Sequence, residues 1–168
     1  MAFSLTATGR VHDIFELKPS VLKEKGITLL LADLDNTLTP YSSEVPTEEV
    51  RKWKEELEAN GITLFVVSNS RTATRVPNYC NALGIGYVRH SGKPKIKGFV
   101  RALAENGRKA EETLMVGDQI FTDVLGANRA GLRVILVEPI ELAGNPGRYL
   151  RYAVEVPFRF SVKKGLGF

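Results

Sequence analysis

Two acidic side chains, Asp33 and Asp35, stand where an apolar run near the start of the chain ends. Residues 27–33 have the pattern of a strand buried in a parallel sheet, and ligands of such sheets sit beyond the carboxyl ends of the strands. Two like charges in apolar surroundings cost free energy unless a cation or hydrogen bonds neutralise them. The pair therefore predicts an active site with a bound metal ion, and Mg²⁺ is the ion that carboxylate ligands favour.

Further polar residues follow the other apolar runs, and their types suit one reaction. Ser68 and Asn69 follow the second run, Lys93 follows the short third, and Asp118 and Asp123 follow the fourth. If the strand order brings these ends together, the site holds four carboxylates, a hydroxyl or amide, and a lysine. Phosphoryl transfer needs such a set, because a cation must hold the phosphate against an anionic nucleophile.

Each of these residues taken singly also has a simpler interpretation. Asp-Asn-Thr and Gly-Asp are common turn sequences, and Ser-Asn-Ser is a common helix cap. Turn chemistry has no preference for a lysine after the third strand, however. The order of all four motifs together favours a catalytic site.

The elements that must position these residues alternate between strand and helix along the chain. We expect residues 11–25 to be a helical or irregular entry, and the helix that starts near Thr47 to be capped by that side chain. Short connections leave no room for a cap domain. The pattern predicts an α/β fold: a doubly wound, Rossmann-like parallel sheet of about five strands with helices on both faces. The expected strands are 27–33, 62–67, a short one ending at 88, 113–116 and 132–137, and the expected helices are 46–60, 72–83, 96–106 and 121–130.

Length and composition predict one domain over residues 1–168. A chain of 168 residues with 43% hydrophobic content buries a core without disulfides. It has a single cysteine, Cys80, and opens with no signal-peptide pattern, so we expect a reducing, cytoplasmic setting. No apolar run is long enough to span a membrane.

The net charge of +4 is concentrated in residues 145–168. Acidic and basic residues balance before this segment, whereas within it five basic residues face Glu155 alone. Aromatic residues interleave with the bases, which is typical of a surface for an anionic membrane or a nucleic acid. The simpler alternative is a last helix whose aromatic side chains pack on the sheet while its bases face water.

The four motifs resemble those of the haloacid dehalogenase-like (HAD) phosphohydrolases. They are Asp33-Leu-Asp35-Asn-Thr37, Ser68-Asn69, Lys93-Pro94 and Gly117-Asp118 with Thr122-Asp123. The longer strings DLDNTLTP and GDQIFTDVLGANRAG are similar to the YqeG-type proteins of subfamily IIIA, which are related to phosphatidylglycerophosphate phosphatases.

The resemblance implies a Mg²⁺-dependent phosphomonoesterase without a cap. Asp33 would be the nucleophile that becomes an aspartyl phosphate, and Asp35 the general acid and base. Asp33, the main-chain carbonyl of Asp35, Asp118 and Asp123 would hold the metal. Ser68, Asn69 and Lys93 would bind the phosphoryl group, with Arg71 a weaker candidate for an anionic part of the substrate and Lys95 and Lys97 neighbours of unassigned role.

A large phosphate ester such as phosphatidylglycerophosphate is the substrate that the resemblance and the basic segment favour, which places the protein at the inner face of the membrane. One alternative is a non-catalytic module that binds phosphate, RNA or a ribosomal particle while retaining the cleft. A receiver domain is a second alternative, but receivers carry the acceptor aspartate on a later strand, where this chain has no matching residue.

Overall fold

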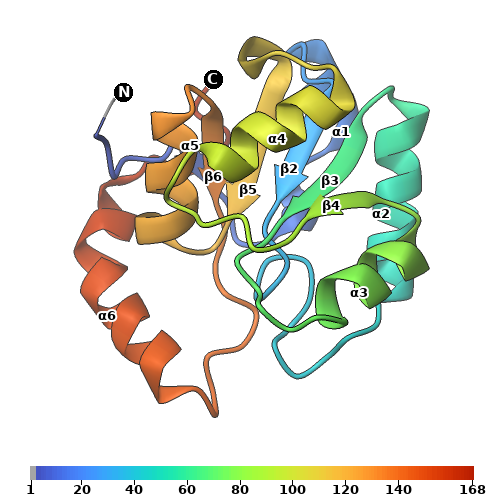
Figure 1. Cartoon of the computed structure of the whole chain (residues 1–168). Coiled ribbons are helices and arrows are strands. Elements are labelled where there is room, and N and C mark those ends of the chain that lie inside the picture. The colour runs from blue at the N-terminus through green and yellow to red at the C-terminus, as the bar shows by residue number, and fades with distance from the viewer. Residues whose placement is uncertain (1–2) are drawn as a thin grey trace.

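Six parallel strands form a single sheet in the computed structural model, which describes residues 3–168. The first two positions of the predicted domain therefore lie outside the described residues. The sheet order is β1-β6-β5-β2-β3-β4, so β2 lies between β5 and β3 at the centre (Figure 1). The strands are β1 Gly9–Arg10, β2 Leu29–Ala32, β3 Thr63–Val67, β4 Gly86–Val88, β5 Thr113–Gly117 and β6 Arg133–Leu136.

Helices cover both faces of this sheet, as the alternating pattern predicts. One core cluster joins one face of the sheet to α1, α2 and α3, and a second joins the other face to α4, η3 and α5. All four residues of β2 are buried, which explains why its sequence is continuously apolar. The helical segments are η1 Ile14–Glu16, α1 Pro19–Glu24, α2 Glu48–Ala59, α3 Arg75–Leu83, α4 Lys97–Asn106, η2 Ala110–Glu112, η3 Ile120–Val124, α5 Leu125–Arg129 and α6 Pro146–Ser161.

Local sequence signals account for the helix that follows β2. The Thr47 side chain accepts a hydrogen bond from the Val50 amide at 3.2 Å, which confirms the predicted cap of α2. Residues 33–47, between β2 and α2, form turns and an isolated bridge, and residues 89–96, before α4, form turns as well. Neither connection, as the structure describes it, contains a cap.

Two features of the fold differ from the sequence expectation. The sheet has a sixth strand, β1, which is too short to show a period. It pairs with β6 and makes an isolated antiparallel bridge from Arg10 to Gly165. The predicted helix 121–130 begins as a π-helical turn, η3, and becomes α-helical only at Leu125. Such wide turns occur often at functional sites.

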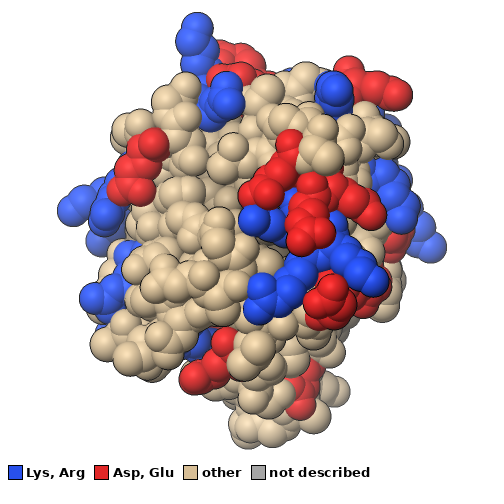
Figure 2. All heavy atoms as spheres, turned by 90° about the vertical axis from the view of Figure 1, so that its right-hand side faces the viewer, with Lys and Arg blue, Asp and Glu red and all other residues tan. Residues whose placement is uncertain are grey.

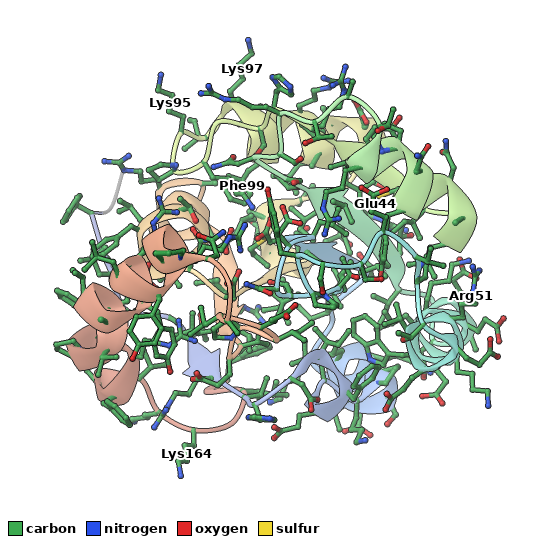
Figure 3. The ribbon with its side chains drawn as sticks, turned by 90° about the horizontal axis from the view of Figure 1, so that it is seen from below. Glu44, Arg51, Lys95, Lys97, Phe99 and Lys164 are labelled. Atoms are coloured by element: carbon green, nitrogen blue, oxygen red, sulfur yellow. The ribbon has the colours of Figure 1, made fainter. Side chains whose placement is uncertain are left out.

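The topology brings the motifs to one end of the sheet. From β2 the chain continues to β3 on one side, whereas β5 pairs with β2 on the other side. The segments after β2 and β3 lie at the lower end of the molecule in Figure 1, and Figure 3 looks onto that end from below. The crevice at such a switch of strand order is where open α/β sheets bind ligands.

Candidate active site

Three buried carboxylates converge at the carboxyl ends of the two central strands. Asp33 follows β2, Asp118 follows β5, and Asp123 lies in η3. Each offers an oxygen atom, and these atoms all lie within 4.8 Å of one another. The amide of Gln119 donates to Asp123 at 3.1 Å and fixes its side chain. The structure thus brings together three of the four predicted metal-site residues through their carboxylates.

Gly117 is a glycine because the Asp123 side chain occupies the space beside it. A Cβ atom added at Gly117 would lie 2.4 Å from the Asp123 carboxyl carbon. No side chain fits at that distance. The glycine of the Gly-Asp motif therefore leaves room for the Asp123 side chain, in addition to ending the strand.

Lys93 lies between two of the carboxylates. Its Nζ atom is 2.9 Å from Asp33 Oδ1 and 2.7 Å from Asp123 Oδ1, and it donates to the Val67 carbonyl at 2.6 Å. Burial would lower the pKa of Lys93, but the adjacent Asp123 and Asp33 raise it above its ordinary value. A fully charged ammonium group therefore stands inside the acidic cluster.

The cluster nevertheless carries more negative charge than Lys93 offsets. Burial, together with the charges of Asp33 and Asp123, raises the pKa of Asp118 well above its ordinary value. Burial likewise raises the pKa of Asp123 to about 6, although Lys93 opposes this shift. Buried oxygen donors with surplus negative charge fit a hard divalent cation such as Mg²⁺.

Asp35 stands apart from the three carboxylates and is held by arginines. Arg75, at the start of α3, donates from Nε to Asp35 Oδ1 at 2.7 Å, and Arg148 Nη2 lies 3.8 Å from Asp35 Oδ2. The Tyr41 ring packs against both guanidinium groups, at 5.3 and 4.9 Å. The buried Asp35 carboxylate is therefore oriented by positive charge.

The two polar residues after β3 have different surroundings. Ser68 is buried, and its hydroxyl accepts from the Ser70 amide at 3.1 Å. Asn69 accepts from the Lys93 amide and donates to the Lys93 carbonyl, both at 2.9 Å, so it holds the backbone that carries Lys93. Lys95 and Lys97 are exposed and point outward at the rim in Figure 3.

The last helix makes contacts that sequence reasoning missed. Arg159 is buried and donates to the main-chain carbonyls of Asp118 and Val137, both at 2.6 Å. Glu155, also buried, accepts from the amides of Ile120 and Phe121 at 2.9 and 3.1 Å. These charged groups satisfy main-chain atoms of the loops that carry the acidic cluster.

The simpler interpretation of this segment, with aromatic side chains packed inward and bases facing water, holds only in part. Arg151, Lys163 and Lys164 are exposed and Phe168 packs against the core, but α6 itself turns charged residues inward. The fully buried residues of α6 are Glu155 and Arg159, whereas Tyr149, Leu150 and Phe160 are exposed. The spacing of Arg148, Glu155 and Arg159 along one helix face could have revealed the inward charged stripe. The charged face of α6 turns inward because main-chain groups at the end of the sheet need hydrogen-bond partners, and no sequence pattern reveals that need.

A cavity of about 290 Å³ opens beside the acidic cluster and is lined by all three predicted phosphate-binding residues, Ser68, Asn69 and Lys93. Its size falls in the lower range for small-molecule sites. It is lined by Asp33, Asp35, Tyr41, Ser68, Asn69, Ser70, Arg71, Thr72, Lys93, Gln119, Thr122, Arg148 and Arg151.

Comparison with known proteins finds a matching family model and similar phosphatases. Residues 3–131 match the family model described as haloacid dehalogenase-like hydrolase. The chain is 37% identical over 149 residues to the probable phosphatase YqeG of Bacillus subtilis, covering 89% of this chain and 85% of that protein. It is 32% identical over 142 residues to the chloroplastic phosphatidylglycerophosphate phosphatase 1 of Chlamydomonas reinhardtii, covering 80% of this chain and about half, 53%, of that relative.

A solved structure of similar fold is the 3-deoxy-D-manno-octulosonate 8-phosphate phosphatase of Moraxella catarrhalis, in complex with magnesium, phosphate and KDO. The TM-score is 0.54 at 21% identity, covering 71% of this chain and 72% of that one. At this identity the likeness shows the fold, a parallel sheet of the HAD type.

Proposed function

Because this chain belongs to the haloacid dehalogenase-like hydrolases and is a phosphatase of that family, we propose that it is a Mg²⁺-dependent phosphomonoester hydrolase with Asp33 as nucleophile. The observation that carries the proposal is the placement of Asp33 beside Lys93 and two further buried carboxylates at one cavity. A nucleophile, a charged phosphate ligand and a cation site then meet the same phosphoryl group.

Asp33 and Asp35 divide the chemistry between them. An Asp33 oxygen forms a bond to phosphorus as the bond to the ester oxygen breaks, and Asp35 protonates the departing alkoxide. The deprotonated Asp35 then takes a proton from the water that attacks the aspartyl phosphate. Phosphate leaves and Asp33 is restored. Lys93 and Ser68 hold the phosphoryl oxygens, and Arg75 keeps the Asp35 carboxylate in place through its hydrogen bond of 2.7 Å.

The residues that would hold Mg²⁺ are Asp33, Asp118, Asp123 and the main-chain carbonyl of Asp35. When bound, the ion supplies positive charge that offsets the carboxylates and the phosphoryl oxygens. Thr37 contributes by donating to Asp118 Oδ1 at 3.3 Å, which orients that carboxylate.

The substrate that we propose is a large phosphate ester, with phosphatidylglycerophosphate the candidate that the chloroplast relative's name supports. Within the described residues, the segments between β2 and α2 and between β4 and α4 hold only turns and an isolated bridge, which leaves the cavity open to a bulky ester.

The outward face of α6 supports an encounter with an anionic membrane. Among the described residues after Asn145 every exposed charged side chain is basic. Arg151 lies in α6 close along the helix to the exposed Leu150 and Val154, and Lys163 and Lys164 follow the helix. In contrast, basic and acidic side chains mingle over α2 and α3 on the opposite side of the molecule (Figure 2). No helix in residues 3–168 has the length and hydropathy of a membrane span. From the basic and apolar residues of this segment we propose that the protein works in the cytoplasm, peripheral to the inner membrane face.

Release of phosphate from an aryl phosphate, with and without Mg²⁺, tests the catalytic proposal. The parent protein is expected to show metal-dependent turnover, and Asp33→Asn to lose at least about a thousandfold in kcat. Asp13→Asn is the matched control, because Asp13 caps η1, does not line the cavity of Asp33, and can be replaced as a cap by asparagine. Absence of metal-dependent turnover on this compound and on a panel of natural phosphates would favour the non-catalytic binding module instead.

Flotation with vesicles of anionic phospholipid tests the membrane encounter. We expect Val154→Ser to weaken vesicle binding, while Val100→Ser on α4 leaves it unchanged, since the two valines are equally exposed at 54% and 52%. Binding that is equal for both variants, or retention of RNA in place of vesicles, would contradict the proposal.

A further inference from the structure

Arginine side chains at the cavity of Asp33 have no assigned task in the reaction. Arg71, Arg148 and Arg151 line this cavity, from the segment after β3 and from α6. Arg75 already neutralises Asp35 at 2.7 Å, and Lys93 already stands beside Asp33. Cationic groups therefore remain at the cavity after its carboxylates and a single phosphoryl group have found their partners.

Arg148 has unused hydrogen-bonding capacity. Its Nη1 atom is buried and finds no hydrogen-bond acceptor among residues 3–168. Its Nη2 atom lies 3.8 Å from Asp35, which is beyond hydrogen-bond distance. A buried guanidinium nitrogen without an acceptor costs free energy, and an anionic ligand in the cavity would supply the missing acceptor.

The position of Arg148 is fixed by the loop that precedes it. Asn36 donates to the Glu141 carbonyl at 2.8 Å and accepts from the Glu141 amide at 3.2 Å, which ties that loop to the segment after Asp35. Asn145 caps α6 by accepting from the Arg148 amide at 3.1 Å. Arg151, one turn later, donates to Gln119 at 2.7 Å. The two arginines are thus held at the cavity by the same backbone that shapes the site.

The position of Arg148 beside Asp35 indicates which part of a substrate Arg148 would contact. Asp35 is the proposed proton donor to the leaving group, so Arg148 stands on the leaving-group side of the phosphoryl position. We propose that Arg148 and Arg151 form a subsite for a second phosphate group carried by the leaving group. The inference rests on the proposed function, because it takes Asp33 and Asp35 in their catalytic roles.

Substrate pairs with and without a second phosphate on the leaving group test this subsite. Glycerophosphoglycerophosphate carries a phosphodiester on its leaving group and glycerol 3-phosphate does not; fructose 1,6-bisphosphate and fructose 6-phosphate make the same comparison with a monoester. The parent is expected to prefer the doubly phosphorylated member of a pair by about tenfold or more in kcat/KM. The pair with the larger preference shows whether the diester or the monoester is the group recognised.

Substitution of the arginines should remove the preference itself. We expect Arg148→Gln and Arg151→Gln each to lower the ratio of the two kcat/KM values several-fold, mainly through KM, and the double variant to bring it near one. Arg101→Gln is the control, since Arg101 is an exposed arginine of α4 paired with Glu105. Calorimetric titration of Asp33→Asn with the same ligands measures the preference without turnover.

The outcomes separate the two proposals. A parent that hydrolyses both members of each pair equally, or a double variant that keeps the preference, overturns the subsite while leaving the phosphatase intact. A parent that hydrolyses neither member of either pair, and neither the aryl phosphate nor the panel of natural phosphates, overturns the proposed function. The titration then still reports whether the arginines select the second phosphate.

Discussion

Lys93 and its two carboxylate neighbours show how single residues balance charge at the site. Its side chain is 1% exposed and contacts Asp33 and Asp123 at hydrogen-bond distance. A buried charge needs a neighbouring group of opposite charge, because removal of either partner leaves the other buried and uncompensated. The negative charge of the acidic cluster must therefore be offset by a cation, which is the Lys93 ammonium group or a metal ion.

Replacement of Lys93 by methionine should upset this balance. Lys93→Met is expected to lower the free energy of unfolding by about 3–5 kcal/mol, as urea denaturation without metal would measure. The double variant Lys93→Met/Asp123→Asn should lose less, because it removes one of the uncompensated charges. Equal losses in the single and the double variant would show that packing, and not charge, is what Lys93 provides.

Gly117 offers a test of packing at residue scale. Gly117→Ala forces the new methyl group against the Asp123 side chain, so the carboxylate must move out of the cluster. We expect a loss of about 1–3 kcal/mol in stability and a weaker apparent affinity for Mg²⁺ in phosphate-release assays. Gly147→Ala is the control, because a Cβ atom there meets only Asn145 Oδ1, at 3.7 Å. Unaltered Mg²⁺ dependence in Gly117→Ala would contradict the explanation given for this glycine.

At the scale of elements, α6 braces the loops that carry the acidic residues. Arg159 bonds to the carbonyl of Asp118, and Glu155 bonds to the amides at the start of η3, which carries Asp123. Three separate elements therefore meet through two side chains of one helix. A helix that resembles a surface appendage in sequence is a structural part of the site.

Arg159→Met should reveal this brace. The carbonyls of Asp118 and Val137 would lose a buried charged donor, so we expect about 3–5 kcal/mol less stability by urea denaturation and a raised Mg²⁺ requirement for turnover. Arg101→Met, on the exposed surface of α4, should alter neither quantity. A variant of Arg159 that is destabilised but keeps its Mg²⁺ requirement would limit the role of α6 to stability.

For the whole molecule, the raised pKa values of Asp118 and Asp123 link folding to pH and to metal. Both carboxyl groups hold protons more strongly in the folded chain than in the unfolded chain. Between the ordinary aspartate pKa and about 6, the folded state therefore binds more protons, and metal-free stability falls as pH rises through this window. In the proposed function Mg²⁺ binds the deprotonated carboxylates, so we expect its stabilising effect to grow over the same pH range.

Thermal unfolding at several pH values checks this linkage. The increase in Tm caused by Mg²⁺ is expected to be small at about pH 5 and to reach several degrees at about pH 7.5. In Asp118→Asn the increase should be small at both values, because one ligand is lost and the like-charge repulsion is relieved. An increase that does not vary with pH in the parent would refute the linkage.

Several parts of the fold and of the site were readable in the sequence because they depend on local signals. The apolar run of β2, the Thr47 cap of α2 and the polar residues that end each strand are properties of neighbours along the chain. The two-residue strand β1 and the π-helical turn η3 gave no such signal. β1 is held by pairing with β6, and η3 carries the Asp123 side chain that packs against Gly117.

The chemical identity of the site, with its aspartates, serine and lysine, was present in the order of the motifs, because parallel strands must deliver their carboxyl ends to one edge. The arginines around Asp35 and the inward charged face of α6 depended on contacts between residues far apart in the chain. Arg159 reaches Asp118 across 41 positions and Arg75 reaches Asp35 across 40, to satisfy buried groups that exist only once the sheet has formed.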